Sequence, residues 1–392
     1  MKQPIIHNSR FDTLVVNAGP LKNIATGIGR YIRELYRQIQ VRYPELVIRY
    51  FDGIRLCEQM PVPPGGRSPW TAAVDLAWRL PPGFVYMARM LAHEMSARRF
   101  YRVSRGFDIY HEAGYFPYKA AGNVKTVFTI HDLSLKIMPQ FHPKDRVRFF
   151  NKYFEKSLNL ADAIITPSAF TGKEFQKTYP DMPARIHPIP LGCDKSLFYD
   201  YPREKINAFK AQKRLPEKYV LFAGTSDPRK NIRAVFDALA HLPAHVKLVC
   251  TGWSGWGKDG QGSRHASGLK DRIIYTGYVS DAELALLYAG ARVFVYPSFY
   301  EGFGLPVLEA MACGCPVVCA DTASLPEVAG DAAILCDPDD SICLADAIQR
   351  VFDSDELYSR MRRQGLKRAA GFDWSKTAGK TVEVFEYVCV QT

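Results

Sequence analysis

The sequence contains no apolar run of the roughly eighteen residues that a membrane-spanning helix needs, and its first residues lack the apolar stretch of a signal peptide. Its nine cysteines form no CxxC pair and no metal-ligand spacing. Such scattered cysteines are typical of reduced thiols in a cytosolic protein, and they argue against a disulfide framework or a zinc site. We therefore expect a cytoplasmic protein with no bound metal.

The second half of the chain has almost no net charge, so the positive excess lies in the N-terminal half. Residues 1–195 hold 28 basic and 16 acidic side chains, whereas the remaining residues hold 23 and 24. The asymmetry indicates either an anionic partner for the N-terminal half or simply a basic, solvated surface. The candidate partners are nucleic acid, an anionic membrane surface and a phosphate-bearing lipid.

The 392 residues are more than one hydrophobic core usually accommodates, so two domains are expected. Short apolar segments alternate with helical segments in both halves, which predicts an α/β fold with a doubly wound parallel sheet in each. Residues 57–69 are expected to form a loop and residues 190–199 a linker. The expected strands are 13–17, 46–51, 107–111, 125–130, 163–166, 186–191, 219–223, 246–250, 273–276, 293–296, 316–320 and 333–335.

Residues 70–105 combine aromatic and aliphatic side chains with many arginines and only two acidic residues. We expect a pair of helices interrupted at Pro81 and Pro82. A basic, aromatic-rich amphipathic segment can lie on a membrane interface. Packing of the same helices on their own domain explains the pattern equally well.

The stretch 297–315, PSFYEGFGLPVLEAMACGC, holds two acids around a predicted strand–turn–helix junction. Glu301 lies in the turn, and Glu309 lies on a helix that is otherwise apolar. A buried carboxylate needs hydrogen-bond donors, which either a ligand diol or a neighbouring amide or arginine can supply. Amides at the helix start, from Phe303 to Leu305, favour an anion. The stretch therefore predicts a site for a phosphorylated, polyhydroxylated ligand.

GTSDPRKN, residues 224–231, follows one predicted strand and precedes a helix. Arg229 and Lys230 stand at that helix start, where positive charge opposes the helix dipole unless an anion lies between. A pyrophosphate fits both side chains, because arginine can bind it through two hydrogen bonds and lysine as a point charge. Two solvated cations are the alternative.

Two N-terminal features point to the same kind of ligand. In ATGIGRY, residues 25–31, Gly27 and Gly29 let the backbone approach an anion, although the spacing is not the GxGxxG of dinucleotide enzymes. His131 ends a predicted buried strand, where it can donate to a sugar hydroxyl or a phosphoryl oxygen. The acidic DPD at 337–339 follows a strand and is interpreted as turn chemistry rather than a metal site.

Taken together, these motifs resemble those of retaining nucleotide-sugar glycosyltransferases of the GT-B fold, specifically glycosyltransferase family 4. The resemblance covers nearly the whole chain and includes ATGIGRY, TIHD, FAGTSDPRKN and PSFYEGFGLPVLEAMACGCPVV. It implies two Rossmann-like domains facing a central cleft. Residues 1–192 would bind the acceptor, residues 193–372 the nucleotide sugar, and a final helix, 373–392, would cross back to the first domain.

The resemblance also implies roles for individual residues. Glu301 would contact the donor sugar, Glu309 the ribose, and Lys230 the leaving diphosphate. Gly29 would lie opposite the diphosphate, and His131 beside the transferred sugar. The donor would further be lined by Gly27, Thr225, Tyr278, Val279, Phe303, Gly304 and Leu305, with Tyr278 and Val279 bordering the base.

One position departs from the family pattern. Many members carry an arginine directly after the glycine that ends the first strand of the second domain, and here that residue is Thr225. Arg229 would then take over the phosphate contact. The variant GTxxPRKN is similar to a subgroup rich in bacterial mannosyltransferases that use GDP-mannose.

The resemblance implies a metal-independent, retaining hexosyltransferase that needs no cofactor besides its donor, with GDP-mannose favoured. The acceptor would be a lipid-diphosphate-linked saccharide of O-antigen or exopolysaccharide synthesis, reached at the inner face of the plasma membrane through the basic N-terminal domain. A UDP-sugar donor and a nucleotide-sugar 2-epimerase remain alternatives. A nucleic-acid partner is not expected, because the E-x7-E and PRKN motifs are intact.

Overall fold

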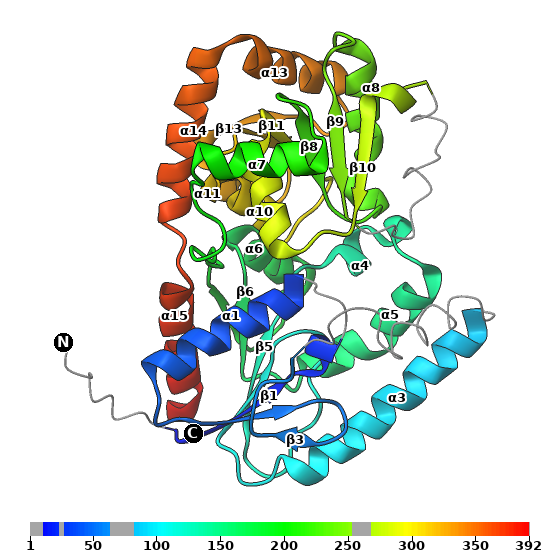
Figure 1. The fold of residues 1–392 in the computed structure, drawn as a ribbon. Helices are drawn as coiled ribbons and strands as arrows, with labels where there is room; N and C mark the ends of the chain where they lie inside the picture. The colour runs from blue at the N-terminus through cyan, green and yellow to red at the C-terminus, as the bar shows by residue number, and fades with distance from the viewer. Residues whose placement is uncertain (1–10, 23–26, 63–81, 253–267, 392) are drawn as a thin grey trace, which may run out of the picture. The chain divides into compact units, whose positions relative to one another are not determined.

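The computed structural model of the chain describes residues 11–22, 27–62, 82–252 and 268–391. The chain divides into two compact units, each with its own parallel sheet (Figure 1). The first unit comprises Met1–Pro190 together with Trp374–Thr392, and the second comprises Leu191–Asp373.

The first unit contains a seven-stranded sheet of order β3-β2-β1-β4-β5-β6-β7, in which every neighbouring pair except β2 and β3 is parallel. Its strands are β1 (Thr13–Asn17), β2 (Val47–Phe51), β3 (Leu56–Cys57), β4 (Ile109–Glu112), β5 (Lys125–Thr129), β6 (Ala163–Thr166) and β7 (Arg185–Pro188). Its helices are η1 (Gly19–Lys22), α1 (Gly27–Arg42), α3 (Pro82–Val103), α4 (Ser134–Ile137), η2 (Pro139–Phe141), α5 (Lys144–Leu158), α6 (Ala169–Thr178) and α15 (Trp374–Val390).

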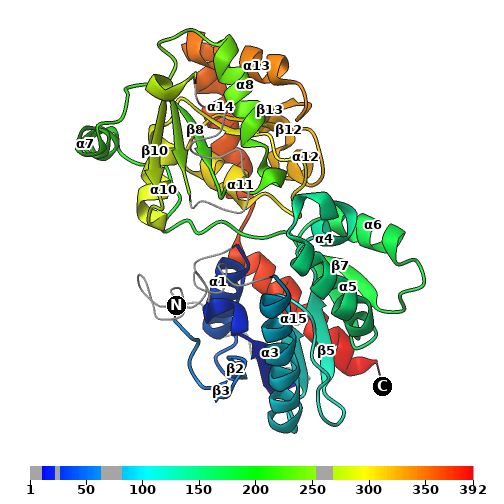
Figure 2. The ribbon, with the colours of Figure 1, turned by 90° about the vertical axis from the view of Figure 1, so that its right-hand side faces the viewer.

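The last helix, α15, packs against α1 of the first unit although more than three hundred residues separate them (Figures 1 and 2). Trp374, Ala378, Val382 and Phe385 recur at helical spacing and are all buried. The Phe385 ring meets that of Phe11 edge-on, with 5.9 Å between ring centroids. This apolar stripe makes α15 part of the first unit's core.

The second unit contains a six-stranded sheet of order β10-β9-β8-β11-β12-β13, and all of its strand pairs are parallel. Its strands are β8 (Val220–Ala223), β9 (Leu248–Thr251), β10 (Ile273–Gly277), β11 (Val293–Tyr296), β12 (Val317–Ala320) and β13 (Ala333–Cys336). Its helices are α7 (Arg203–Lys213), η3 (Pro228–Lys230), α8 (Ile232–His241), η4 (Lys270–Arg272), α10 (Asp281–Gly290), α11 (Leu305–Ala312), α12 (Leu325–Ala329), η5 (Gly330–Ala332), α13 (Ser341–Asp353) and α14 (Asp355–Ala370).

Both sheets have a topological switch point, where the strand order reverses direction. It lies between β1 and β4 in the first unit and between β8 and β11 in the second. Ligands of doubly wound sheets bind beyond the carboxyl ends of the strands at such a point. A nucleotide bound to the second unit is therefore expected to contact the residues that follow β8 and β11.

The doubly wound prediction is confirmed, with two local corrections. Cys57 was expected to begin a loop, but Leu56–Cys57 pairs antiparallel with β2, because a two-residue strand carries no readable periodicity. Helix α7 was not predicted, since Phe209 is its one fully buried side chain and its apolar stripe is weak. The helix expected before Pro81 lies outside the described residues. None of the helices in the described ranges combines the length and the apolar composition needed to cross a bilayer.

Candidate active site

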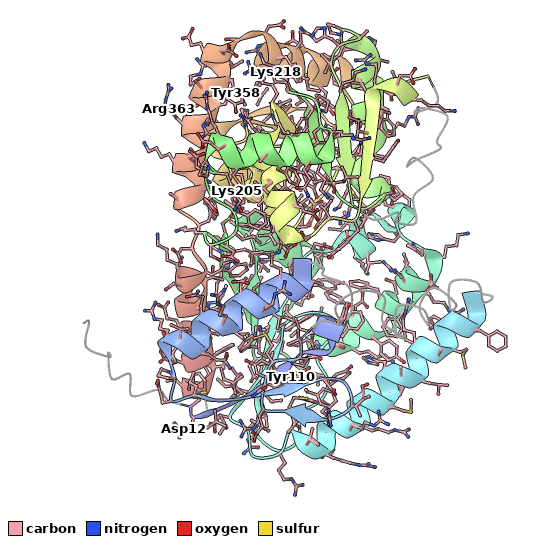
Figure 3. The ribbon with its side chains drawn as sticks, in the orientation of Figure 1. Asp12, Tyr110, Lys205, Lys218, Tyr358 and Arg363 are labelled. Carbon is pink, nitrogen blue, oxygen red and sulfur yellow. The ribbon has the colours of Figure 1, made fainter. Side chains whose placement is uncertain are left out.

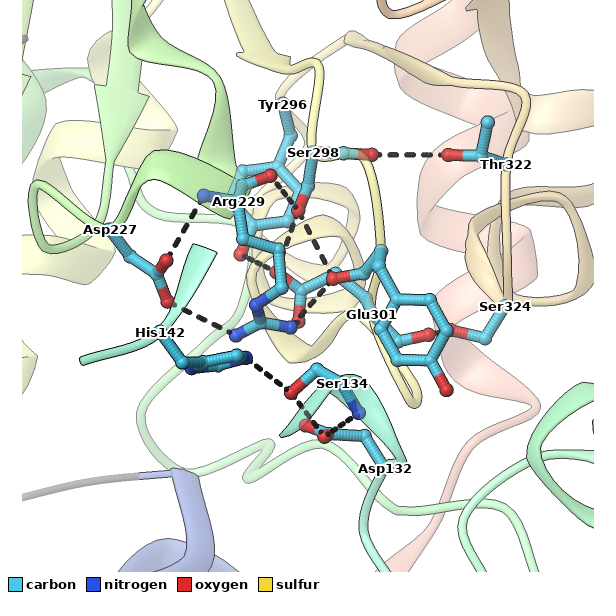
Figure 4. A network of polar contacts seen from close by, with 11 residues as sticks. Asp132, Ser134, His142, Asp227, Arg229, Tyr296, Ser298, Glu301, Thr322 and Ser324 are labelled. Atoms are coloured by element: carbon cyan, nitrogen blue, oxygen red, sulfur yellow. Dashed lines mark hydrogen bonds and ion pairs between the residues drawn. The ribbon is translucent and has the colours of Figure 1, made fainter. Parts of the chain in front are cut away.

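Glu301 lies in the turn between β11 and α11, and three neighbours fix its carboxylate (Figure 4). The hydroxyls of Tyr296 and Ser298 donate to Oε1 at 2.7 and 3.0 Å, and Arg229 Nη1 lies 3.5 Å from Oε2. The Glu301 side chain is 13% exposed. The protein thus holds this carboxylate in one orientation while leaving part of it accessible to a ligand.

Glu309 lies about one turn into α11 and is almost fully buried, with 3% of its surface exposed. The Tyr288 hydroxyl lies 3.5 Å from Glu309 Oε2. Glu301 and Glu309 both oppose the lowering of the Lys230 pKa by burial, so both of the acids predicted from their spacing act on the same cation. The structure therefore brings the two ends of the E-x7-E motif to the same place.

The start of α11 lacks a capping side chain. Gly304 adopts φ 101°. A Cβ at Gly304 would lie 2.6 Å from Leu325, so only glycine fits. The Phe303 ring packs edge-on against Phe372, which leaves its amide, not its ring, to meet a ligand. The predicted use of the amides of Phe303, Gly304 and Leu305 by an anionic ligand stays a prediction.

Lys230 follows β8 and lies across the switch point from Glu301. Its Nζ is 5.8 Å from the centre of the Tyr296 ring. A Cβ at Gly224, the residue that follows β8, would lie 2.9 Å from the same Nζ. Burial lowers the pKa of Lys230, and Glu301 and Glu309 partly offset this effect. Among the described residues no carboxylate forms an ion pair with Lys230, so its charge is available to an anionic ligand.

Arg229 has a different environment from the one predicted for it. Its Nη1 donates to the Tyr300 carbonyl at 2.6 Å, and Nη2 lies 3.4 Å from Asp227 (Figure 4). Asp227 also caps η3 by accepting from the Arg229 amide. The guanidinium therefore joins the loop after β8 to the turn after β11. A phosphate contact from Arg229 stays a prediction, as does a donor contact from the partly buried Thr225.

Glycines stand at the end of β10 and directly after β8 and β9, a feature that the sequence did not reveal. The Gly224 amide donates to the Thr251 carbonyl, and the Gly252 amide donates to the Gly277 carbonyl. A Cβ at Gly252 would lie 2.1 Å from the Gly224 carbonyl oxygen. Residues far apart in the chain meet here only because β8, β9 and β10 are adjacent. The result is a backbone floor beside Lys230 on which a ligand can approach closely.

Tyr278 and Val279 follow the third of these glycines. The Tyr278 side chain is 63% exposed, and Val279 is partly buried in the same loop before α10. An exposed aromatic ring at the edge of a backbone floor is suited to stacking on a flat, aromatic ligand. Their predicted place beside the nucleotide base agrees with this position, and it stays a prediction.

His131 follows β5 in the first unit, where its Nε2 lies 2.8 Å from the Ala113 carbonyl oxygen. A carbonyl can only accept, so Nε2 carries the hydrogen. Burial lowers the pKa of His131, which favours the neutral ring. Its remaining nitrogen, Nδ1, can then only accept a hydrogen bond. The expectation that His131 donates to a ligand is corrected in this respect: the neutral ring offers an acceptor for a hydroxyl.

Glu112 forms a second buried centre in the first unit that the sequence did not reveal. It ends β4 and is fully buried at the switch point. Asn17 Nδ2 and the Tyr110 hydroxyl donate to Oε2 at 2.6 and 2.7 Å, and the amides of Gly114 and Tyr115 donate to Oε1 at 3.0 and 2.8 Å. Figure 3 labels Tyr110 on this sheet. One carboxylate thus holds the loop that contains Ala113, the partner of His131.

The remaining predicted N-terminal residues lie at the start of α1. Gly27 begins the helix, and a Cβ there would meet nothing within 4 Å. Gly29, two residues further on, is buried. Residues 25 and 26 of the predicted glycine loop lie outside the described residues. Within the described part of the chain, no three His, Cys, Asp or Glu side chains gather as a metal site would require.

Two doubly wound units, with a lysine and two carboxylates around the switch point of the second, define a GT-B glycosyltransferase. The chain belongs to glycosyltransferase family 4. The model of that family matches residues 25–197, and the model described as "Glycosyl transferases group 1" matches residues 204–368.

Relatives and solved structures agree with this assignment. The chain is 34% identical over 376 residues to O-antigen chain mannosyltransferase B of Escherichia coli, which covers 94% of this chain and 97% of the relative. It is 31% identical to the serotype-specific mannosyltransferase WbdA of Escherichia coli over 67% of this chain and 33% of WbdA. Sucrose-phosphate synthase of Thermosynechococcus elongatus shares the fold, with a TM-score of 0.74, 23% identity and coverage of 97% and 100%.

Proposed function

We propose that this protein is a retaining mannosyltransferase of bacterial O-antigen synthesis with GDP-mannose as its donor. The second unit binds the donor, and the first unit binds a lipid-diphosphate-linked saccharide as acceptor. The observation that carries the proposal is the buried Lys230 at the switch point, beside the Tyr296 ring and under the electrostatic influence of Glu301 and Glu309. The mannosyltransferases among the relatives support the choice of sugar.

In this reaction the bond between the anomeric carbon and the diphosphate breaks, and negative charge develops on the leaving oxygen. Lys230 and the amides at the start of α11 stabilise that charge, so no divalent metal is needed. The acceptor hydroxyl attacks from the same face, and the leaving phosphate takes its proton. Glu301 holds sugar hydroxyls rather than acting as a nucleophile, because Tyr296, Ser298 and Arg229 already fix its carboxylate.

A thermal-shift comparison of nucleotides tests the donor. GDP and GDP-mannose are expected to raise the melting temperature, whereas UDP and UDP-glucose are not; binding at one hundred times Kd stabilises by about 2.7 kcal/mol. Glu309→Gln is expected to weaken the shift with both guanine nucleotides. Glu301→Gln should remove only the additional shift of GDP-mannose over GDP. A shift with UDP-glucose and none with GDP-mannose would overturn the donor assignment.

The proposed membrane contact is carried by α3, the long cyan helix of Figure 1. Phe84, Met87, Leu91 and Met95 share one face of this helix and are between 49% and 70% exposed. Arg98 and Arg102 continue the same face and are exposed. The opposite face packs on α5, where Tyr153 donates to Glu94. An apolar outer face that ends in arginines suits an anionic lipid surface.

Vesicle flotation tests this contact. The protein is expected to float with phosphatidylglycerol vesicles at low salt and to remain below at high salt, because charge attraction is screened. Met87→Glu with Leu91→Glu should abolish flotation, and Ile342→Glu on α13, which is 67% exposed, is the matched control. Flotation of the double variant would refute the contact. A dimer that the double variant dissociates would instead assign the face to a second copy.

A further inference from the structure

A hollow of about 510 Å³ lies on the first unit and is lined by none of the residues assigned above. One side is formed by η2, through Pro139 and Gln140. The other side is one face of α5, because its lining residues Lys144, Val147, Arg148 and Asn151 follow helical spacing. The lining thus combines two cations, two amides and two apolar side chains.

The two cations of the hollow have no carboxylate partner among the described residues. The nearest acid on α5, Asp145, is engaged by Arg89 of α3, with 3.0 Å between Nη1 and Oδ2. The Arg148 guanidinium lies 4.6 Å from the centre of the Tyr86 ring, a contact that orients it without neutralising it. Two oriented positive charges in one hollow favour a ligand with more than one negative charge.

The hollow is connected to the segment that follows His131. The Ser134 hydroxyl and amide both donate to Asp132 Oδ1, at 2.7 and 2.9 Å. His142, between η2 and α5, lies 3.0 Å from the same hydroxyl (Figure 4). These contacts fix the entry of α5 relative to the residue beside His131. A ligand in the hollow would therefore lie on the same loop system as the predicted acceptor site.

We propose that this hollow binds the diphosphate of the lipid-linked acceptor. Arg148 and Lys144 bind the phosphoryl oxygens, Gln140 and Asn151 donate to the remaining ones, and Pro139 and Val147 contact the first carbons of the lipid. Tyr86, which stacks on Arg148, stands two residues after Phe84, where the exposed apolar face of α3 begins. In this arrangement a site for the diphosphate lies beside the apolar face of α3 that is proposed to contact the membrane, as a ligand with a charged headgroup and a lipid chain requires. The inference rests on the proposed acceptor class.

Calorimetry with farnesyl diphosphate tests the hollow, with GDP present at saturation to fill the donor site. The double variant Lys144→Ala/Arg148→Ala is expected to raise Kd at least tenfold. Lys156→Ala/Lys177→Ala removes the same charge from exposed positions of the first unit and should change Kd less than twofold. Farnesol should bind both variants and the unchanged protein equally weakly, because it lacks the phosphates.

The outcomes separate the two proposals. Absence of farnesyl diphosphate binding by the unchanged protein, or equal Kd values for the two double variants, would overturn the hollow as a diphosphate site. Failure of GDP-mannose to shift the melting temperature would overturn the donor assignment and leave the farnesyl diphosphate result unaffected. An unchanged melting temperature of Lys144→Ala/Arg148→Ala without ligand shows that the variant is folded. Inorganic diphosphate that competes as well as farnesyl diphosphate would show that the lipid is not recognised, and it would overturn the assignment to a lipid.

Discussion

Lys230→Met is expected to lower kcat by about 10²- to 10³-fold, the loss typical of removing one preorganised group that stabilises developing charge. Methionine keeps the length of the side chain and removes its charge. Lys230 lies near Glu301 and Glu309 in a buried setting that lowers its pKa, and a bound diphosphate would favour its protonated form. The charge is held over the Tyr296 ring before the donor arrives, which avoids reorganisation during the reaction.

Steady-state kinetics with GDP-mannose, in the presence of EDTA, measure this effect. Lys218→Met removes an exposed charge from the same unit and should leave kcat within twofold (Figure 3). A kcat for Lys230→Met within threefold of the unchanged protein would remove Lys230 from the proposed site. For the unchanged protein, a loss of activity in EDTA that magnesium restores would contradict the metal-independent reaction.

The parts of the site that the sequence predicted are those contained in one local motif. Glu301 and Glu309 lie eight residues apart, and Lys230 follows directly after a strand, so strand–turn–helix spacing was enough to single them out. The backbone floor of Gly224, Gly252 and Gly277 was not predictable in the same way. It depends on which strands are neighbours in the sheet, and no local stretch of sequence determines the order of strands in a parallel sheet.

The orientation of His131 illustrates the same limit at the level of one side chain. Its position at a strand end was apparent, but its hydrogen-bonding role was not, because the partner is a backbone carbonyl eighteen residues earlier. The Glu112 centre depends on a still longer separation, since Asn17 and Glu112 lie ninety-five residues apart. The contacts of such isolated polar residues cannot be predicted from sequence spacing, because only the fold brings the residues together.

Glu112→Ala is expected to destabilise the first unit by about 3 kcal/mol, because it leaves four buried donors without their acceptor. For a unit of this size the melting temperature would fall by roughly 6–12 °C. Burial raises the pKa of Glu112, and the four hydrogen bonds oppose that shift. Burying the carboxylate therefore costs free energy. In return, the carboxylate holds the segments after β1 and β4 together.

The variant should also change catalysis at temperatures where it is fully folded. Without Glu112 the amides of Gly114 and Tyr115 lose their anchor, so the Ala113 carbonyl no longer fixes His131. We expect KM for the acceptor to rise while the GDP-induced thermal shift stays unchanged, since the donor residues belong to the other unit.

Two matched variants separate a positioning role from a general loss of stability. Glu112→Gln keeps a carbonyl acceptor for the two amides but sets its NH₂ group against the Asn17 amide and the Tyr110 hydroxyl, so an intermediate loss of about 1–2 kcal/mol is expected. Glu58→Ala, at a carboxylate that is 82% exposed, should change stability by less than about 0.5 kcal/mol. If Glu112→Ala melts within 2 °C of the unchanged protein, the four hydrogen bonds do not anchor the loop. If it melts lower but keeps its acceptor KM, Glu112 stabilises the unit without positioning His131.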